Sequence, residues 1–198
     1  MVLIRRQLAI ESMREADVPQ VQEIERQIFS SPWPRNAYFR ELSSRNSAHY
    51  IVLRQDPPDG GDLLGYGGLW RMHDEAHVTT IGVRHDRQHE GLGRIVFAAL
   101  LLAGFKLGAK WVTLEARASN LNAIRMYEGF DFKVIGRRRG YYTDNAEDAI
   151  VMWSDSMYSG RFRRIFAENL TRIETQAHEH GYDVQGLNLD GLAGKDSG

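Results

Sequence analysis

The chain has 198 residues, of which 42% are hydrophobic and 26% charged, and its formal net charge is −1. That length suits one sizeable domain rather than two. A nearly neutral chain lacks the basic excess of proteins that bind nucleic acid directly, and the absence of cysteine excludes disulfides, thiolate metal sites and cysteine nucleophiles. The N-terminus has no apolar run typical of a signal peptide, and no stretch is apolar for long enough to cross a membrane. We therefore expect a soluble cytoplasmic protein with no membrane partner.

The first half of the chain alternates between strand and helix patterns. Asp17 stands where a helix N-cap belongs, and apolar residues follow it at the spacing of one helical face. A cluster of Pro, Asp and Gly at 56–61 separates two apolar runs, which predicts a hairpin. In chain order we expect a strand at 8–13, a helix after Asp17, a short helix that starts at Pro34, strands at 50–53 and 63–70, and a further strand at 77–83.

The second half predicts two long helices and three more strands. One helix begins at Leu92 and ends near Gly108, and a second, capped by Ser119 and Asn120, ends at Gly129. Strands are expected at 111–116, 132–135 and 149–152, the last two joined by a polar turn. Strands followed by this strand–helix alternation predict an α/β fold in which a mixed sheet carries helices on both faces.

The strand pattern stops after Trp153, so we expect a main domain at 1–157 and a C-terminal extension at 158–198. Apolar residues at helical spacing predict a helix at 161–177, and its apolar face is expected to pack on the sheet or on a partner. The segment 181–198 is rich in Gly and Asp, and we expect it to be disordered.

A glycine-containing loop, Gln88–Gly93, follows a predicted strand and opens a helix. Glycine lacks a Cβ, so such a loop can adopt positive φ and let a phosphate approach the backbone. The N–H groups at the helix start then favour an anion, and a pyrophosphate would fit. A tight turn that binds nothing is the alternative. The loop lacks the Gly-Lys-Ser/Thr of nucleotide hydrolases, and no acidic residue ends a strand where a dinucleotide fold requires one.

A second group of residues, Glu115–Asn120 with Tyr127 and Glu128 two turns further along, lies at a later strand–helix junction. Its presence favours a phosphate-binding loop over a turn that binds nothing. Together with the loop, it resembles the GNAT superfamily of acetyltransferases and, within that superfamily, the RimI family of N-terminal alanine acetyltransferases. The resemblance runs from about Leu8 to Trp153. Four motifs carry it: Phe29-Ser30-Ser31-Pro32-Trp33, Asp74-Glu75-Ala76-His77, Leu114-Glu115-Ala116-Arg117-Ala118-Ser119-Asn120 and Arg137-Arg138-Arg139-Gly140-Tyr141-Tyr142.

The resemblance implies a GNAT fold, with a mixed, mostly antiparallel sheet of six to seven strands. It implies acetyl-coenzyme A as cosubstrate and a protein N-terminus, the alanine of a ribosomal protein, as acceptor. Glu115 would be the catalytic base and Tyr127 the acid. The expected coenzyme-binding residues are Ile81, Gly82, Val83, Gln88, His89, Glu90, Gly91, Leu92, Gly93, Arg94 and Asn120, and the expected acceptor-binding residues are Phe29, Trp33, Tyr141 and Tyr142.

The chain departs from the family pattern at two positions. Glu90 stands in the loop where the family often has a basic or neutral residue, so we expect its side chain to point outward while its N–H still binds. Asp131 replaces a Gly that usually follows the tyrosine helix, which reshapes that turn.

Several alternatives stay open at this stage. Glu115 could pair with Arg117 or solvent, and Phe29 and Trp33 could fill a core edge. The Arg137–Arg139 run could meet coenzyme phosphates, but we expect it to face solvent. The enzyme could act on lysine side chains or a small amine, or the chain could be a non-catalytic acyl-coenzyme A sensor or partner-binding module. No metal is expected, because the histidines have no third ligand at convincing spacing; they are His77, His89, and the pair His178 and His180 around Glu179.

Overall fold

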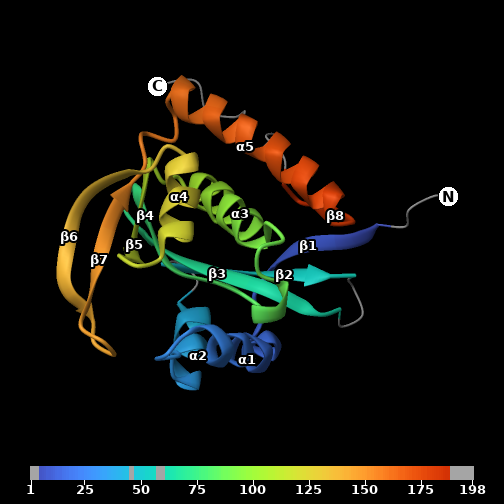
Figure 1. Cartoon of the computed structure of the whole chain (residues 1–198), viewed down its shortest axis with the longest axis horizontal. Coiled ribbons are helices and arrows are strands. Elements are labelled where there is room, and N and C mark those ends of the chain that lie inside the picture. Colours follow the sequence, from blue (N-terminus) through green and yellow to red (C-terminus); the bar gives the residue numbers. More distant parts are fainter. Residues whose placement is uncertain (1–4, 45–46, 57–60, 188–198) are drawn as a thin grey trace.

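The computed structural model describes residues 5–44, 47–56 and 61–187. Within these residues the chain forms one eight-stranded sheet with helices on both faces (Figure 1). The strands are β1 (Arg6–Ser12), β2 (Ala48–Gln55), β3 (Leu63–Met72), β4 (Glu75–Val83), β5 (Trp111–Arg117), β6 (Lys133–Tyr142), β7 (Glu147–Trp153) and β8 (Tyr182–Gln185). The helices are α1 (Val18–Ile28), α2 (Arg35–Ser43), α3 (Leu92–Lys106), α4 (Leu121–Gly129) and α5 (Gly160–Glu179), with short 3-10 turns η1 (Glu15–Asp17) and η2 (His85–Arg87).

The strand order across the sheet is β6-β7-β5-β4-β3-β2-β1-β8. Neighbours are antiparallel except for the β4–β5 and β1–β8 pairs, which are parallel. Helices α1 and α2 cover one face, and α3, α4 and α5 lie on the other (Figure 1). The predicted mixed, mostly antiparallel sheet is confirmed, with one strand more than the six to seven expected.

The sheet splits between β4 and β5, and this split positions the site described below. The two strands pair from Glu75 to Val78 on β4, against Trp111 to Leu114 on β5. A register shift in the β3–β4 pairing then follows, because Leu69 pairs with Val78 while Gly68 pairs with Thr80. Such a bulge bends the strand that carries the extra residue. Beyond it β4 stays with β3, β5 stays with β7, and a wedge opens between them.

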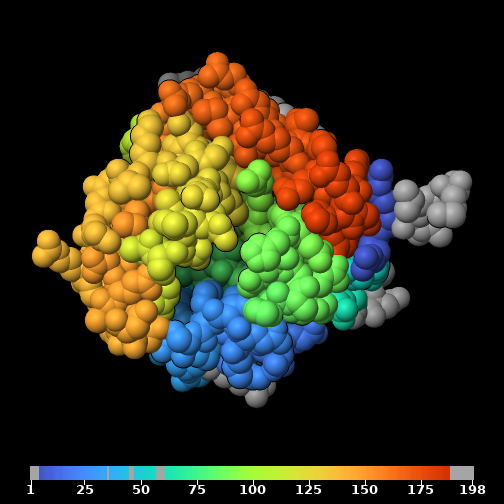
Figure 2. Space-filling model, in the orientation of Figure 1, coloured from blue at the N-terminus to red at the C-terminus, as the bar shows by residue number. Residues whose placement is uncertain are grey.

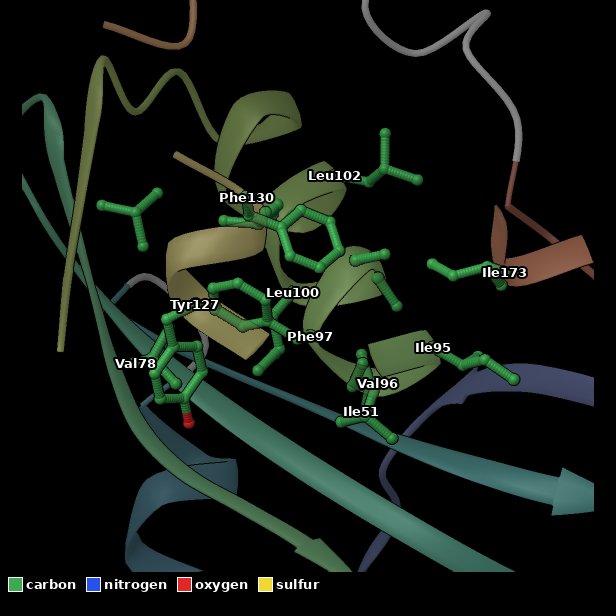
Figure 3. Packing of buried hydrophobic residues seen from close by; sticks show 14 of the residues in the cluster. Ile51, Val78, Ile95, Val96, Phe97, Leu100, Leu102, Tyr127, Phe130 and Ile173 are labelled. Carbon is green, nitrogen blue, oxygen red and sulfur yellow. The ribbon is translucent and has the colours of Figure 1, made fainter. Parts of the chain in front are cut away.

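Helix α3 forms the centre of the larger core. Because it packs on the sheet, with α4 and α5 on its outer side, it is apolar on nearly every face. The ring of Phe97 is fully buried and lies edge-on to Tyr127, Phe130 and Phe132 at centroid distances of 4.8, 5.1 and 5.3 Å. Figure 3 shows this cluster. Burial of one such ring stabilises the fold by about 1.5–3 kcal/mol, so α3 and α4 are held firmly together.

The C-terminal extension belongs to the same core. The apolar face of α5, which includes Phe162, Phe166 and Ile173, is buried in the cluster around α3. Strand β8 then pairs in parallel with β1, from Arg6 with Tyr182 to Ala9 with Gln185. The predicted disorder is therefore wrong for these four residues. A four-residue strand that is half polar carries almost no local signal, and it forms because the edge of β1 offers backbone partners. Residues 188–198 of the expected disordered tail lie outside the described residues.

Candidate active site

A cavity of about 390 Å³ occupies the wedge between β4 and β5. One wall is formed by Thr79, Thr80 and Ile81 of β4, and the other by Glu115 and Arg117 of β5. In Figure 2 the hollow lies between the α1–α2 region (blue), α4 (yellow) and the loop after β4 (green). A volume in this range suits a small ligand or the end of an extended chain. The predicted residues that line it are Phe29, Trp33, Ile81, Glu115, Asn120, Tyr127, Tyr141 and Tyr142.

Glu115 is held by a histidine from β4 and an arginine from β6. His77 Nε2 lies 3.0 Å from one carboxylate oxygen, and Arg138 Nη2 lies 3.0 Å from the other. The hydrogen bond from His77 is the main cause that keeps the pKa of Glu115 below its usual value, and it outweighs the opposing effect of burial. The Glu115 side chain is only 7% exposed. The result is a buried, ionised carboxylate at the wall of the cavity.

His77 links Glu115 to two further side chains. Thr113 Oγ1 lies 2.9 Å from His77 Nδ1 and donates its single proton to Glu75 Oε1 at 2.8 Å. With that proton donated to Glu75, the Thr113 oxygen is the acceptor in its contact with His77 Nδ1. A continuous path of hydrogen bonds therefore runs from Glu75 at the start of β4 to Glu115 in the cavity.

Tyr127 reaches the cavity from α4. Tyr127 is 8% exposed, its ring packs against Phe97, and the residue lines the cavity. Figure 3 shows the phenol oxygen pointing away from Phe130 and Leu102. Burial raises the pKa of the phenol above its ordinary value, and the nearby Tyr142 adds to this. The phenol is therefore protonated throughout the neutral range.

Aromatic side chains from two separate parts of the chain line the cavity. Phe29 is 36% exposed at the end of α1, and Trp33 packs on Tyr38 at 5.7 Å between ring centroids. From β6, Tyr141 and Tyr142 lie edge to face at 5.2 Å. All four predicted acceptor-binding residues therefore line one cavity.

Buried Glu25 fixes the loop that carries these aromatics. Its carboxylate accepts hydrogen bonds from Tyr38 Oη at 2.6 Å, Tyr66 Oη at 3.0 Å and the backbone N–H of Trp33 at 3.0 Å. A carboxylate that is 1% exposed is stable only with such partners. Glu25 was not among the predicted site residues. Its position on the apolar face of α1, next to Ile24, is the signal that could have identified it.

Arg117 does not pair with Glu115, although the sequence allowed it. It binds Asp144 and Glu147 at 2.8 and 3.1 Å, and its guanidinium lies 4.0 Å from the centre of the Tyr142 ring. Glu147 also accepts from the backbone N–H of Ser119 at 2.8 Å. This cluster ties the β6–β7 turn to the junction of β5 and α4, and so positions Tyr142. Strand β6 is longer than predicted, because residues 136–142 continue it instead of forming a turn.

The side chains of Arg137 and Arg138, in the arginine run that was expected to face solvent, point to opposite faces of β6 because side chains alternate along a strand. Arg138 binds Glu115, whereas Arg137 binds Asp148 at 2.9 Å. The side chains of Arg137 and Arg138 are 58% and 57% exposed, as the solvent-facing prediction expected, and each also forms an ion pair. His77 belongs to one of the four family motifs, but the sequence did not predict it as a site residue. Its pairing partner on β5 is Thr113, which shares a face with Glu115 two residues later, so strand register was the signal that could have found it.

The predicted phosphate loop has the expected local geometry. Gly91 is the N-cap of α3 and adopts φ +81°, a conformation that glycine takes without strain. His89 also adopts a positive φ of 68°. The first turn of α3 leaves the N–H groups of Leu92 and Gly93 without intrahelical acceptors, and Arg94 follows in the same turn. This arrangement fits a pyrophosphate.

The other predicted coenzyme residues lie along β4 and at the start of α4. Ile81 lines the cavity, while Gly82 and Val83 are buried. A Cβ on Gly82 would lie 2.3 Å from the Tyr66 ring, so this glycine serves close packing. Asn120 lines the cavity and caps α4, because its Oδ1 accepts from the N–H of Ala123 at 3.1 Å.

Glu90 and Asp131, the two residues that depart from the family pattern, each form an ion pair with an arginine. The Glu90 carboxylate is bound by Arg87, with both contacts at 3.0 Å, and by the hydroxyl of Tyr182 at 2.7 Å. Asp131 adopts φ 65° and forms two 2.7 Å contacts with Arg161. Within the described residues no group of three metal-ligating side chains is found, and no helix of that part of the chain is long and apolar enough to cross a membrane.

Residues 18–132 match the acetyltransferase (GNAT) family. A Bacillus subtilis (strain 168) protein named as a putative ribosomal protein bS18-alanine N-acetyltransferase is 37% identical over 145 residues, which span 73% of this chain and 93% of the relative. The N-alpha-acetyltransferase RimI of Mycobacterium tuberculosis is 37% identical over 155 residues, 75% of this chain and 93% of that protein. About a quarter of this chain therefore lies outside each alignment.

Solved structures show the same architecture. The crystal structure of the ribosomal-protein-S18-alanine N-acetyltransferase from Escherichia coli superposes with a TM-score of 0.64 at 32% identity, over 74% of this chain and 92% of that one. Ard1 from Thermoplasma volcanium, at 21% identity and a TM-score of 0.65, shares the fold. The family match covers more than half of the sequence, and the Bacillus, Mycobacterium and Escherichia relatives exceed 30% identity. The chain therefore belongs to the acetyltransferase (GNAT) family, among relatives that are N-acetyltransferases.

Proposed function

We propose that this protein transfers the acetyl group of acetyl-coenzyme A to the α-amine of a protein N-terminus, with the N-terminal alanine of a ribosomal protein as its natural acceptor. One observation carries the proposal. A buried, ionised Glu115 and a protonated Tyr127 line the same cavity, next to a loop whose geometry fits a pyrophosphate. The relatives named for bS18 alanine acetylation support the choice of acceptor.

Glu115 would act as the base. The amine nitrogen attacks the thioester carbonyl carbon, the carbon–sulfur bond breaks, and the nitrogen must lose a proton. For an α-amine with a pKa near 8, deprotonation at pH 7 costs on the order of 1.2 kcal/mol. For a lysine amine the cost is roughly 4.6 kcal/mol. An ionised carboxylate, acting directly or through water, suits the deprotonation of the α-amine, which costs less than that of lysine.

Tyr127 would act as the acid. The sulfur leaves as a thiolate and needs a proton, and the raised pKa of the phenol keeps that proton on Tyr127 at neutral pH. The hydroxyl group is the polar end of a ring fixed by Phe97 and Phe132. Its direction is therefore set by the core of the protein, which favours one orientation toward the sulfur.

The groove at the cavity mouth suits an extended peptide end. Phe29 and Trp33 would grip it from one side and Tyr141 and Tyr142 from the other, since all four line the cavity. On the coenzyme side, Gly91 and the first turn of α3 would hold the pyrophosphate, and the β4 backbone from Ile81 would accompany the pantetheine arm. Asn120 would contact that arm at the start of α4.

The test is a pair of peptides that differ in which amine is free. One begins Ala-Arg with a free N-terminus, and the other has the same sequence with its N-terminus blocked and a lysine added. We expect turnover of the first only. Turnover of the blocked peptide would move the assignment to lysine side chains, and coenzyme binding without turnover of either would favour a small amine substrate or an acyl-coenzyme A sensor.

A further inference from the structure

The loop proposed to hold the pyrophosphate contains a carboxylate that is bound on two sides. Arg87 Nε and Nη2 each lie 3.0 Å from a different oxygen of Glu90. The hydroxyl of Tyr182 donates to Glu90 Oε2 at 2.7 Å. Paired charge-assisted hydrogen bonds of this kind fix both the position and the direction of a carboxylate.

An unrestrained carboxylate in this loop would oppose coenzyme binding. It would repel the pyrophosphate, and it could itself accept hydrogen bonds from the free N–H groups at the start of α3. The contacts to Arg87 and Tyr182 direct it elsewhere and balance its charge. Glu90 is therefore compatible with an anion site because of these partners.

Tyr182 comes from the C-terminal extension. It is the first residue of β8 and is fully buried, and the guanidinium groups of Arg6 and Arg87 lie 5.4 and 5.7 Å from the centre of its ring. From α5, the side chain of Gln176 lies so close to Gly91 that a Cβ there would be 2.9 Å from Gln176 Cδ. Figure 2 shows the loop (green) and the end of the extension (red) side by side.

The extension also binds Asp131, the second residue that departs from the family pattern. Arg161 binds Asp131 in the turn after α4, and Asn169 Nδ2 donates to the carbonyl oxygen of Gly129 at 2.8 Å. Helix α4 carries Tyr127. The two residues that depart from the family pattern are thus both bound by the segment that lies beyond the family resemblance.

We infer that the C-terminal extension is a positioning element of the coenzyme site, in which Tyr182 and Arg87 hold the Glu90 carboxylate away from the pyrophosphate. This inference rests on the proposed coenzyme site. Tyr182 is a positioning residue: it acts on the coenzyme through Glu90 and the shape of the loop. The extension therefore determines the affinity for the coenzyme more than the rate of acetyl transfer.

The test compares Tyr182→Phe with Tyr158→Phe in the full-length protein. Both changes remove one hydroxyl group from an aromatic ring beside α5, but Tyr158 lies at the opposite end of that helix and packs on Phe105. Coenzyme A affinity is measured by calorimetry. The kcat and the KM for acetyl-coenzyme A are measured by steady-state kinetics with the Ala-Arg peptide as acceptor. Loss of a hydrogen bond to a charged group predicts about tenfold weaker coenzyme binding and a matching rise in KM for Tyr182→Phe. The kcat should stay near that of the wild type, and Tyr158→Phe should leave affinity unchanged.

Glu90→Gln separates this account from a general loss of stability. Glutamine has no charge to direct away, so in the Glu90→Gln background the Tyr182→Phe change should weaken coenzyme binding by less than about twofold. Should Tyr182→Phe fold poorly, Gln176→Ala offers a second variant, since it removes the contact to Gly91 from a partly exposed position of α5. We expect it to weaken coenzyme binding without lowering kcat.

Each outcome separates the inference from the proposed function. If the wild type binds coenzyme A and Tyr182→Phe binds it with the same affinity, the inference is overturned and the proposed function stands. An equal loss in Tyr182→Phe and Tyr158→Phe, or a loss that persists in the Glu90→Gln background, would also overturn it. Failure of the wild type to bind coenzyme A would overturn the proposed function, and the inference with it.

Discussion

His77 Nε2 lies 3.0 Å from Glu115 Oε2, across the two parallel strands whose separation opens the cavity. His77 lies in the paired part of β4, opposite Thr113, whereas Glu115 lies one residue beyond the last pair, Val78 with Leu114. The base is therefore anchored to the intact sheet and stands where the two strands separate. Because His77 also contacts Thr113 and, through it, Glu75, the direction of the Glu115 carboxylate is set by a chain of side chains.

The first prediction concerns this contact. In His77→Ala the pKa of Glu115 should rise toward its ordinary value, because the hydrogen bond that lowers it most is lost. Loss of a hydrogen bond to a charged group predicts a drop in kcat of about tenfold. The measurement is a titration of ¹³C-labelled glutamate carboxyl groups beside steady-state kinetics. His77→Gln, which keeps an N–H donor, should recover part of both effects; an unchanged Glu115 titration in His77→Ala would contradict the account.

Replacement of the base gives the second prediction. Glu115→Gln keeps the shape of the side chain and a hydrogen-bond acceptor but cannot take a proton, so kcat should fall by about 10²-fold to 10⁴-fold. Coenzyme affinity should change little, because Glu115 lies apart from the phosphate loop. Calorimetry and initial rates on the Ala-Arg peptide test both parts. Unchanged turnover would exclude Glu115 as the base and favour the alternative function as a non-catalytic acyl-coenzyme A sensor or partner-binding module.

The third prediction concerns the pH dependence of Tyr127. Its pKa is raised by burial, so the phenol should stay protonated as the pH rises, and the kcat of the wild type should show no loss from this group up to about pH 10, the ordinary value for tyrosine. Tyr127→Phe keeps the packed ring and should fold with a nearly unchanged melting temperature, while kcat falls at every pH. A Tyr127→Phe enzyme with full activity would remove this residue from the mechanism.

The fourth prediction links Glu147 to stability at low pH. Its hydrogen bonds from Ser119, with the contribution of Arg117, lower its pKa from 4.5 to about 2 in the folded protein. A depressed folded-state pKa adds stability above the unfolded value, and that stability is lost as the pH falls from about 4.5 toward 2. Denaturant titrations of the wild type and Glu147→Gln should therefore differ at pH 6 and converge as the pH is lowered through this window. A constant difference would show that Glu147 stabilises the turn by some other means.

Much of the fold follows from patterns that act over short distances in the sequence. The apolar face of α1, the helix cap at Asn120 and the glycine before α3 each mark an element that the structure confirms. Strand β8 could not be predicted in this way. Tyr182–Gln185 is short and half polar, and its stability comes from β1, which is separated from it by almost the entire chain.

The same distinction holds for the site. Glu115, Tyr127 and the four aromatic residues were expected from motifs, and they line one cavity. The residues that hold them were not expected, because pairing across strands decides which side chains meet. His77 meets Glu115 through the β4–β5 register, and Tyr182 meets Glu90 through the return of the extension to the sheet edge.

The most direct test of the account uses one peptide that begins with Ala-Arg and also contains a lysine, with both amines free. After incubation with acetyl-coenzyme A and the wild-type protein, tandem mass spectrometry locates the acetyl group. The account predicts a single acetyl group on the N-terminal α-amine, with the lysine unmodified. Acetylation of the lysine with a free N-terminus remaining would contradict it.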